Sequence, residues 1–150
     1  MQQNIHTSFD DRDEREHDRR VAGKTPGFAM VLVVEDSPRI QECVRQLVTR
    51  ALDPRDANVV VASSADDAIA LMRSFCFDLV VSDYELGDSD GGQVLSYVQG
   101  VLPHMLDRFV FLSGSDEPAR LLPGRVIDKG VGPDEFVSSL RRMIPESVRR

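Results

Sequence analysis

Leu79-Val80-Val81-Ser82-Asp83 is a short apolar run that ends on an acid and is followed by the turn-forming sequence Glu85-Leu86-Gly87-Asp88-Ser89-Asp90-Gly91-Gly92. A short apolar run bounded by turn residues is typical of a buried strand. Asp83 then stands at the carboxyl end of that strand, where ligands bind in open α/β sheets. The pattern makes Asp83 the first candidate for chemistry.

A second apolar run, Met30-Val31-Leu32-Val33-Val34, also ends on acids, Glu35 and Asp36. If the two runs are neighbouring strands of a parallel sheet, they lie ~5 Å apart. The carboxylates of Glu35, Asp36 and Asp83 then crowd into one pocket. Their mutual repulsion calls for a cation.

The rest of the chain alternates between strand-like and helix-like segments. Further strands are expected at 58–62, 109–112 and 125–127, and helices from Pro38 to about Leu52, after Ser64, over 94–105, as one turn around 119–122 and from Pro133. The expected inward-facing helix residues include Ile40, Val44, Leu47, Val48, Ala51, Ala68, Ile69, Met72, Phe75, Val94, Leu95, Val98, Val101, Leu102, Met105, Phe136, Val137, Leu140 and Met143. Strands that alternate with helices predict an α/β fold with a doubly wound, five-stranded parallel sheet.

Length and charge limit the possible functions. The 150 residues fit one domain, expected over 28–150, after a charged and disordered tail at 1–27. The net charge of −7 disfavours direct DNA binding. No run approaches a membrane-spanning length, so a soluble cytoplasmic protein is expected. Cys43 and Cys76 have no metal-binding spacing and are expected to be ordinary core or surface residues.

Five polar residues are expected at one edge of the sheet: Glu35, Asp36, Asp83, Ser113 after the fourth strand and Lys129 after the fifth. Carboxylates at this density suit Mg²⁺ or Mn²⁺. A carboxylate beside such an ion can attack a phosphoryl group because the metal neutralises charge that repels the donor. Ser113 could bond a phosphoryl oxygen, and Lys129 would supply fixed positive charge.

Four motifs carry a family resemblance: Val31-Leu32-Val33-Val34-Glu35-Asp36-Ser37, then Asp78-Leu79-Val80-Val81-Ser82-Asp83-Tyr84-Glu85-Leu86-Gly87 with Asp90-Gly91, Leu112-Ser113-Gly114, and Asp128-Lys129-Gly130. In this order, each at a strand end, they resemble the receiver domain of two-component response regulators. The resemblance spans about Met30 to Arg150. It implies a flavodoxin-like sheet with strand order 2-1-3-4-5.

The resemblance also implies roles for the five residues. Asp83 falls on the phosphoacceptor, Glu35 and Asp36 on the acidic metal-binding pair, Ser113 on the hydroxyl and Lys129 on the phosphate-pairing lysine. Asp36 and Asp83 would bind Mg²⁺ directly, Glu35 through water, and Glu85 through its backbone carbonyl. The phosphoryl donor would be a sensor histidine kinase or a histidine phosphotransfer protein. The chain would be a signalling phosphoacceptor rather than an enzyme, apart from self-phosphorylation and self-dephosphorylation.

Four features depart from the family pattern. Gly130 and Gly87 stand where proline is common, and the bond before Gly130 is expected to be trans because a cis bond to a non-proline residue costs ~2.5–4 kcal/mol. Val126 stands where family members carry a switch aromatic. Only 13 residues, from Ser113 to Arg125, join the last two strands, which predicts a shortened fourth helix.

Three hypotheses follow from these observations. The first is a stand-alone phosphoacceptor that acts by binding an unidentified protein target. The second, favoured by Val126 and the short link, is a receiver-like interaction module that does not switch by phosphorylation. The third is a small Mg²⁺ enzyme, because the acids loosely resemble Toprim or haloacid-dehalogenase arrangements. Glu85 is either simply exposed or placed to screen attacking water.

Overall fold

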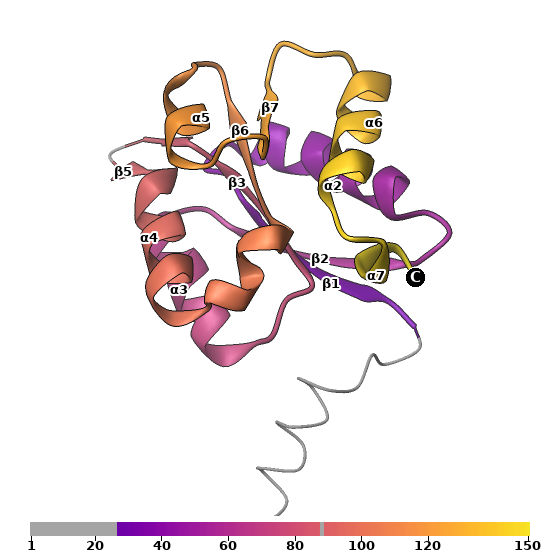
Figure 1. The fold of residues 1–150 in the computed structure, drawn as a ribbon, viewed down its shortest axis with the longest axis horizontal. Helices are drawn as coiled ribbons and strands as arrows, with labels where there is room; N and C mark the ends of the chain where they lie inside the picture. The colour runs from indigo at the N-terminus through magenta and orange to yellow at the C-terminus, as the bar shows by residue number, and fades with distance from the viewer. Residues whose placement is uncertain (1–26, 88) are drawn as a thin grey trace, which may run out of the picture.

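A computed structural model describes residues 27–87 and 89–150. Its main sheet has five parallel strands in the order β2-β1-β3-β6-β7 (Figure 1). Their bounds are Ala29–Val34 for β1, Ala57–Ala62 for β2, Leu79–Asp83 for β3, Phe109–Ser113 for β6 and Val126–Asp128 for β7. With β6 and β7 as the fourth and fifth strands, the predicted order 2-1-3-4-5 is confirmed. The predicted charged tail lies outside the described residues, except for Gly27.

The sheet lies between two layers of helices, and its central strands are buried on both faces. Every residue of β3 and β6 is buried. This pattern is expected for parallel strands covered by helices on both sides. The register pairs Val34 with both Ala62 and Ser82, and Ser113 with Asp128, so the strands end together at one carboxyl edge.

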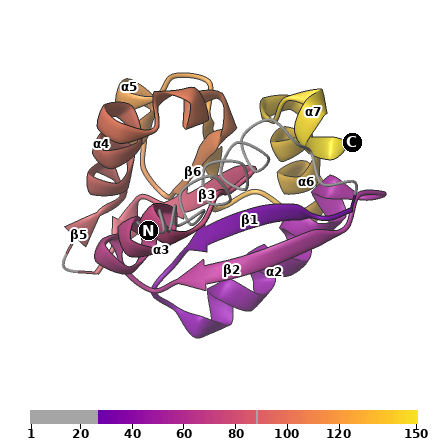
Figure 2. The ribbon, with the colours of Figure 1, turned by 90° about the horizontal axis from the view of Figure 1, so that it is seen from below.

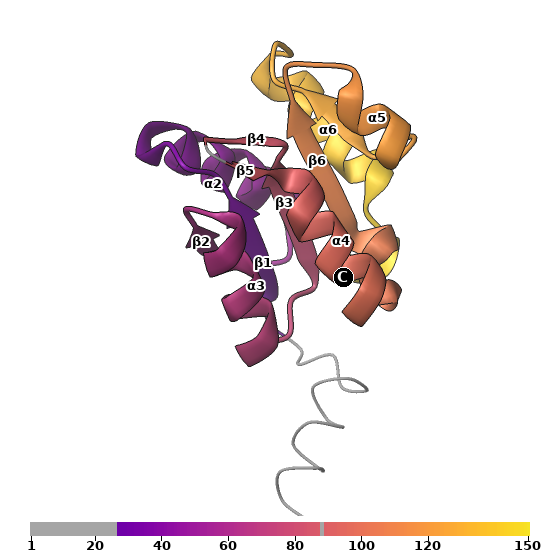
Figure 3. The same ribbon diagram turned by 90° about the vertical axis from the view of Figure 1, so that its left-hand side faces the viewer.

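Helices cover the two faces of the sheet. They are α2 (Pro38–Leu52), α3 (Ala65–Ser74), α4 (Gly91–Val101), α5 (Glu117–Leu121), α6 (Pro133–Met143), α7 (Glu146–Arg149) and the 3₁₀ helix η1 (Pro103–Arg108). One core cluster joins the sheet to α2, α6 and α7, and the other joins it to α3 and α4. Figure 1 shows α2 and α6 on one side of the sheet, and Figure 3 views the molecule from the side of α3 and α4.

Local chemistry explains where the helices begin and end. Pro38 occupies the start of α2, where its missing N–H removes no helical bond. Ser64 caps α3 by accepting a bond from the Asp67 N–H. The predicted helix over 94–105 was too long, because Pro103 cannot continue α4 and begins η1 instead. The helix from Pro133 ends at Met143, and α7 after Pro145 was not predicted.

Three predicted core residues are in fact exposed: Ile40, Phe75 and Val101. Ile40 lies in the first turn of α2, and Val101 is the last residue of α4. Phe75 follows the last residue of α3 with extended backbone, which takes it off the helical stripe. All three residues stand at a helix end, where apolar periodicity overstates burial.

Two connections shape the carboxyl edge of the sheet. The helix between β6 and β7, α5, is five residues long, which confirms the predicted shortening. After β3 the chain forms a small antiparallel hairpin of β4 (Glu85–Leu86) and β5 (Ser89–Asp90), in which Glu85 pairs with Asp90. This hairpin was predicted only as a turn.

The opposite, amino edge joins the beginning of the sheet to the last helix. Arg55 Nη1 donates to the Val148 carbonyl at 2.7 Å, and Nη2 donates to the Phe28 carbonyl at 3.2 Å. Figure 2 shows α7 beside the beginning of β1. Within the described part of the chain, no helix is long and apolar enough to cross a membrane.

Candidate functional site

Three acids meet at the carboxyl edge of the sheet. Glu35 and Asp36 follow β1, and Asp83 is the last residue of the neighbouring strand β3. One carboxylate oxygen from each residue lies within 4.8 Å of the others. The predicted crowding of these three acids is therefore confirmed.

Glu35 is the most constrained of the three acids. Its side chain is 2% exposed, and Oε1 accepts a hydrogen bond from the Ser37 N–H at 3.1 Å. Oε2 is buried and finds no partner among the described residues. Burial, together with the neighbouring Asp83 and Asp36 carboxyls, raises the pKa of Glu35 to about 8. A cation bound at this site would therefore stabilise the ionised form of Glu35.

This donor set fits a divalent cation. Hard ions such as Mg²⁺ and Mn²⁺ take carboxylate oxygens and retain several waters. Glu35 contributes an unpartnered buried oxygen, and the exposed Asp36 leaves one side open for water. Glu35, Asp36 and Asp83 could hold such an ion. The predicted contribution of the Glu85 carbonyl stays a prediction.

Lys129 supplies the one cation that reaches Asp83 among the described residues. It follows β7, and its backbone N–H donates to the Ser113 carbonyl at 3.0 Å, which fixes the loop. Its Nζ lies 2.6 Å from Asp83 Oδ2. Burial alone would lower the pKa of Lys129, but the carboxylates of Asp83, Glu35 and Glu85 outweigh it and raise that pKa. Lys129 is therefore a fixed positive charge.

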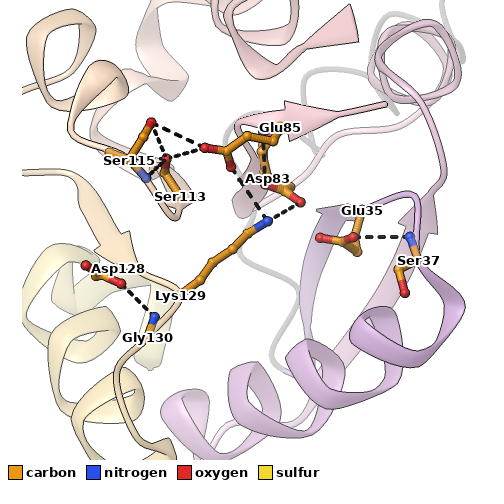
Figure 4. Close-up of polar contacts among 10 residues, drawn as sticks. Glu35, Ser37, Asp83, Glu85, Ser113, Ser115, Asp128, Lys129 and Gly130 are labelled. Carbon is orange, nitrogen blue, oxygen red and sulfur yellow. Dashed lines mark hydrogen bonds and ion pairs between the residues drawn. The ribbon is translucent and has the colours of Figure 1, made fainter. Parts of the chain in front are cut away.

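Asp83 is held through both of its oxygens. Oδ2 accepts from Lys129, and Oδ1 accepts from the Glu85 N–H at 3.0 Å. The residue is 1% exposed. These contacts hold the carboxylate on the side of the site that faces Glu35, as Figure 4 shows.

Ser113, at the end of β6, contacts Glu85 rather than Asp83. Its Oγ donates to Glu85 Oε1 at 2.8 Å and accepts from the Ser115 N–H at 3.0 Å (Figure 4). Burial raises the pKa of Glu85, but the hydrogen bond from Ser113 and the charge of Lys129 oppose it, and the net shift lowers that pKa. Ser115 was not predicted from the sequence as a residue of this site. The spacing Ser113-Gly114-Ser115 was the available signal, since a serine often bonds the backbone two residues on.

Comparison with known proteins agrees with this geometry. The response regulator receiver domain profile matches residues 31–122, more than half of the chain. The chain belongs to the response regulator receiver domain family. The matched stretch contains Glu35, Asp36, Asp83 and Ser113 and stops before Lys129, whose place in the site rests on the structure.

Two curated relatives and one solved structure illustrate the kinship. The chain is 36% identical to Sensor kinase CckA of Brucella abortus over 65% of this chain and 10% of that protein. It is 29% identical to Fimbriae Z protein of Salmonella typhimurium over 73% of this chain and 49% of that protein. The non-phosphorylated HemR receiver domain of Leptospira biflexa aligns with a TM-score of 0.62 at 26% identity, covering 77% of this chain and 93% of that one. The receiver thus spans a tenth to about half of these curated relatives.

The departures of this receiver from the family pattern have structural reasons. Gly87 has φ +58°, which proline cannot adopt because its ring fixes φ near −65°. The Lys129–Gly130 bond is trans, as predicted, and the Gly130 N–H donates to Asp128 Oδ1 at 2.6 Å. Proline therefore fits neither position, because it cannot adopt the φ of Gly87 and lacks the N–H that Gly130 donates.

Three aromatic residues near the site, Tyr84, Phe109 and Phe111, lie in the core, whereas position 126 holds a valine. Val126 is half-buried and pairs with Phe111 across the sheet. Tyr84, next to Asp83, packs edge-to-face on Phe111 with ring centroids 5.5 Å apart, and Phe109 packs on Phe111 at 4.9 Å. Tyr84 therefore serves packing.

Proposed function

We propose that this chain is a receiver that accepts a phosphoryl group on Asp83 in a phosphorelay, with Mg²⁺ or Mn²⁺ as cofactor. The observation that carries the proposal is the convergence at Asp83. Its Oδ2 lies 2.6 Å from Lys129 Nζ, and its carboxylate lies within 4.8 Å of Glu35 and Asp36 oxygens. A buried carboxylate between a fixed cation and an acidic pair suits phosphoryl transfer.

The donor in this proposal is a phosphohistidine of a sensor histidine kinase or a histidine phosphotransfer protein. An Asp83 oxygen attacks phosphorus and forms an acyl phosphate. The P–N bond of the donor breaks, its electron pair stays on the imidazole nitrogen, and that nitrogen takes up a proton. Later attack by water on phosphorus returns the free Asp83 carboxylate and inorganic phosphate, which is self-dephosphorylation.

Each neighbouring group has a role in this transfer. A Mg²⁺ ion held by Glu35, Asp36 and Asp83, with the Glu85 carbonyl as a further ligand, supplies the charge that offsets the incoming phosphoryl oxygens. Lys129 pairs with a phosphoryl oxygen, and the Ser113 hydroxyl donates to another. Lys129 also holds Asp83 in place before the transfer.

The proposal places the receiver domain at residues 28–150 and its output in protein binding. The net charge of −7 supports a protein target over DNA. A cytoplasmic location suits this proposal if the kinase domain that donates the phosphoryl group also faces the cytoplasm. Whether the receiver acts as a stand-alone protein is tested by the mass of the endogenous polypeptide on an immunoblot.

The test is phosphorylation followed by intact mass. The protein is incubated with Mg²⁺ and a small phosphodonor such as acetyl phosphate. One phosphoryl adduct is expected in the wild type and none in Asp83→Asn. Asp66→Asn, which changes an exposed acid in the first turn of α3, should form the adduct normally. An adduct that persists in Asp83→Asn, or its absence from the wild type, contradicts the proposal. Metal-dependent turnover of a phosphoester would favour a small Mg²⁺ enzyme.

A second candidate function is an interaction module that does not switch by phosphorylation. It is favoured by the Glu85 carboxylate, which already engages Ser113 and lies 3.6 Å from Lys129 Nζ. For this candidate we expect no adduct and no binding of beryllofluoride, an unreactive mimic of the phosphoryl group. The same target protein should then bind the wild type and Asp83→Asn equally.

A further inference from the structure

The Glu85 carboxylate lies among donor groups at the carboxyl ends of two strands, β6 and β7. Glu85 Oε1 accepts from Ser113 Oγ at 2.8 Å and from Ser115 Oγ at 3.3 Å. Glu85 Oε2 lies 3.6 Å from Lys129 Nζ. Figure 4 shows the carboxylate pointing toward both serines, beside Asp83. One carboxylate therefore engages three groups, two serine hydroxyls through hydrogen bonds and Lys129 as an ion pair.

Two of these donors are the groups that a phosphoryl oxygen on Asp83 needs. A serine hydroxyl has a single proton, so Ser113 can donate to only one acceptor at a time. In this structure its nearest acceptor is Glu85, with the Ser115 carbonyl at 3.1 Å as the alternative. A phosphoryl group would also place new negative charge beside the Glu85 carboxylate, and like charges repel. Glu85 and a phosphoryl group therefore compete.

The position of the Ser113 oxygen does not depend on Glu85 alone. The Ser115 N–H donates to Ser113 Oγ at 3.0 Å and holds that oxygen at the site. Glu85 is 45% exposed and lies at the start of the β4–β5 hairpin, so its side chain has room to leave. The Ser113 oxygen thus already lies at the site, and only the direction in which the hydroxyl points its proton has to change.

We propose that Glu85 is an internal substitute for the phosphoryl group, which engages Ser113 and Lys129 in the unphosphorylated receiver and must be displaced when Asp83 is phosphorylated. This inference rests on the proposed function. Glu85 acts here as a positioning residue, and its displacement opposes phosphoryl binding. The wild-type receiver should therefore bind phosphoryl mimics more weakly than a variant that lacks the Glu85 carboxylate.

The test is the affinity for beryllofluoride in the presence of Mg²⁺, which requires no phosphodonor. Glu85→Ala should bind it more tightly than the wild type by on the order of tenfold, because a hydrogen bond from Ser113 no longer has to be exchanged. Glu85→Gln should fall between the two, since its amide oxygen still accepts from Ser113 but carries no charge. Glu146→Gln removes one negative charge at the amino edge, in α7, and should change the affinity by less than about twofold because salt screens distant charges.

A double-mutant cycle separates competition from general electrostatics. In a Ser113→Ala background the Glu85 carboxylate has lost its hydroxyl donor, so Glu85→Ala should improve the affinity by a clearly smaller factor. The same factor in both backgrounds would show that Glu85 only adds charge and would overturn the inference. So would equal affinities of Glu85→Ala and the wild type.

The outcomes also separate this inference from the proposed function. If the wild type and Glu85→Ala bind beryllofluoride equally, the phosphoacceptor proposal stands and only the role of Glu85 falls. If neither binds, and neither forms the phosphoryl adduct with Mg²⁺ bound, both fall. Binding by Glu85→Ala alone would support the competition in its strongest form.

Discussion

Lys129 and Asp83 form a close ion pair across the carboxyl edge of the sheet, with Nζ 2.6 Å from Oδ2. The lysine follows β7 and the aspartate ends β3, with β6 between the two strands. The Asp83 side chain is 2% exposed and the Lys129 side chain is 32% exposed. The pair therefore joins a buried anion to a cation at the rim of the site.

Removing the lysine should destabilise the metal-free protein. Lys129→Ala leaves Asp83 buried beside Glu35 and Asp36 without its cation. Because Lys129 is partly exposed, we expect a loss of about 1–3 kcal/mol, less than for a fully buried pair. Mg²⁺ should restore most of this stability, since it brings positive charge to the same carboxylate. Urea unfolding in chelator and in Mg²⁺ measures both effects.

An exposed ion pair provides the matched control. Arg50 Nη2 lies 2.8 Å from Asp134 Oδ1, with the two side chains 53% and 95% exposed. Arg50→Ala should change stability by about 0–1 kcal/mol, with no dependence on Mg²⁺. The prediction is wrong if Mg²⁺ stabilises Lys129→Ala no more than it stabilises Arg50→Ala.

The fold and the acidic cluster followed from the sequence because both depend on where strands end. Apolar runs fixed the strands, parallel pairing brought their carboxyl ends together, and Asp83, Glu35 and Asp36 had to meet. The side-chain partner of Ser113 did not follow. It depends on how the β4–β5 hairpin turns the Glu85 side chain back toward β6, and hairpin geometry is not encoded in hydrophobic periodicity.

The exposure of residues at helix ends also did not follow from the sequence. Val101 and Phe75 continue an apolar stripe in the sequence but lie at or beyond the ends of α4 and α3. Burial there depends on how far the neighbouring helix and sheet extend. Such tertiary lengths cannot be obtained from a local pattern.

Tyr84 should ionise at higher pH than an ordinary tyrosine. Burial, followed by the nearby Glu117 carboxylate, raises its pKa. Tyr97→Phe leaves Tyr84 as the only tyrosine and keeps the aromatic ring at position 97, over which Arg73 lies at 5.7 Å. Absorbance titration of this variant should show ionisation above the usual value of about 10. The native state then loses stability as the pH rises past that value. A midpoint at or below that of free tyrosine would contradict the burial of Tyr84.

The pKa of Glu35 predicts how pH affects the metal-free protein. Folding raises this pKa from 4.5 to about 8, so between these values the native state binds more protons than the unfolded state. The free energy of unfolding therefore falls as the pH rises through this window. In chelator, Glu35→Gln should show a flatter pH profile than the wild type and should be the more stable of the two at the upper end. Urea unfolding between pH 4.5 and about 8 measures how the free energy of unfolding of each protein changes with pH. Parallel profiles for the wild type and Glu35→Gln would contradict the raised pKa of Glu35.

Gly91 places a tight backbone contact directly beneath the acceptor. A Cβ at this position would lie 2.6 Å from the Asp83 carbonyl oxygen and 2.8 Å from Phe111 Cε1, and the Gly91 N–H donates to the Tyr84 carbonyl at 2.7 Å. Gly91→Ala should therefore destabilise the protein by about 1–3 kcal/mol and displace Asp83. Gly100, in the same helix, has nothing within 4 Å of a Cβ, so Gly100→Ala should stabilise the protein by about 0.4–1 kcal/mol. Denaturant unfolding compares the two variants, and equal effects would mean that helix propensity alone governs both positions.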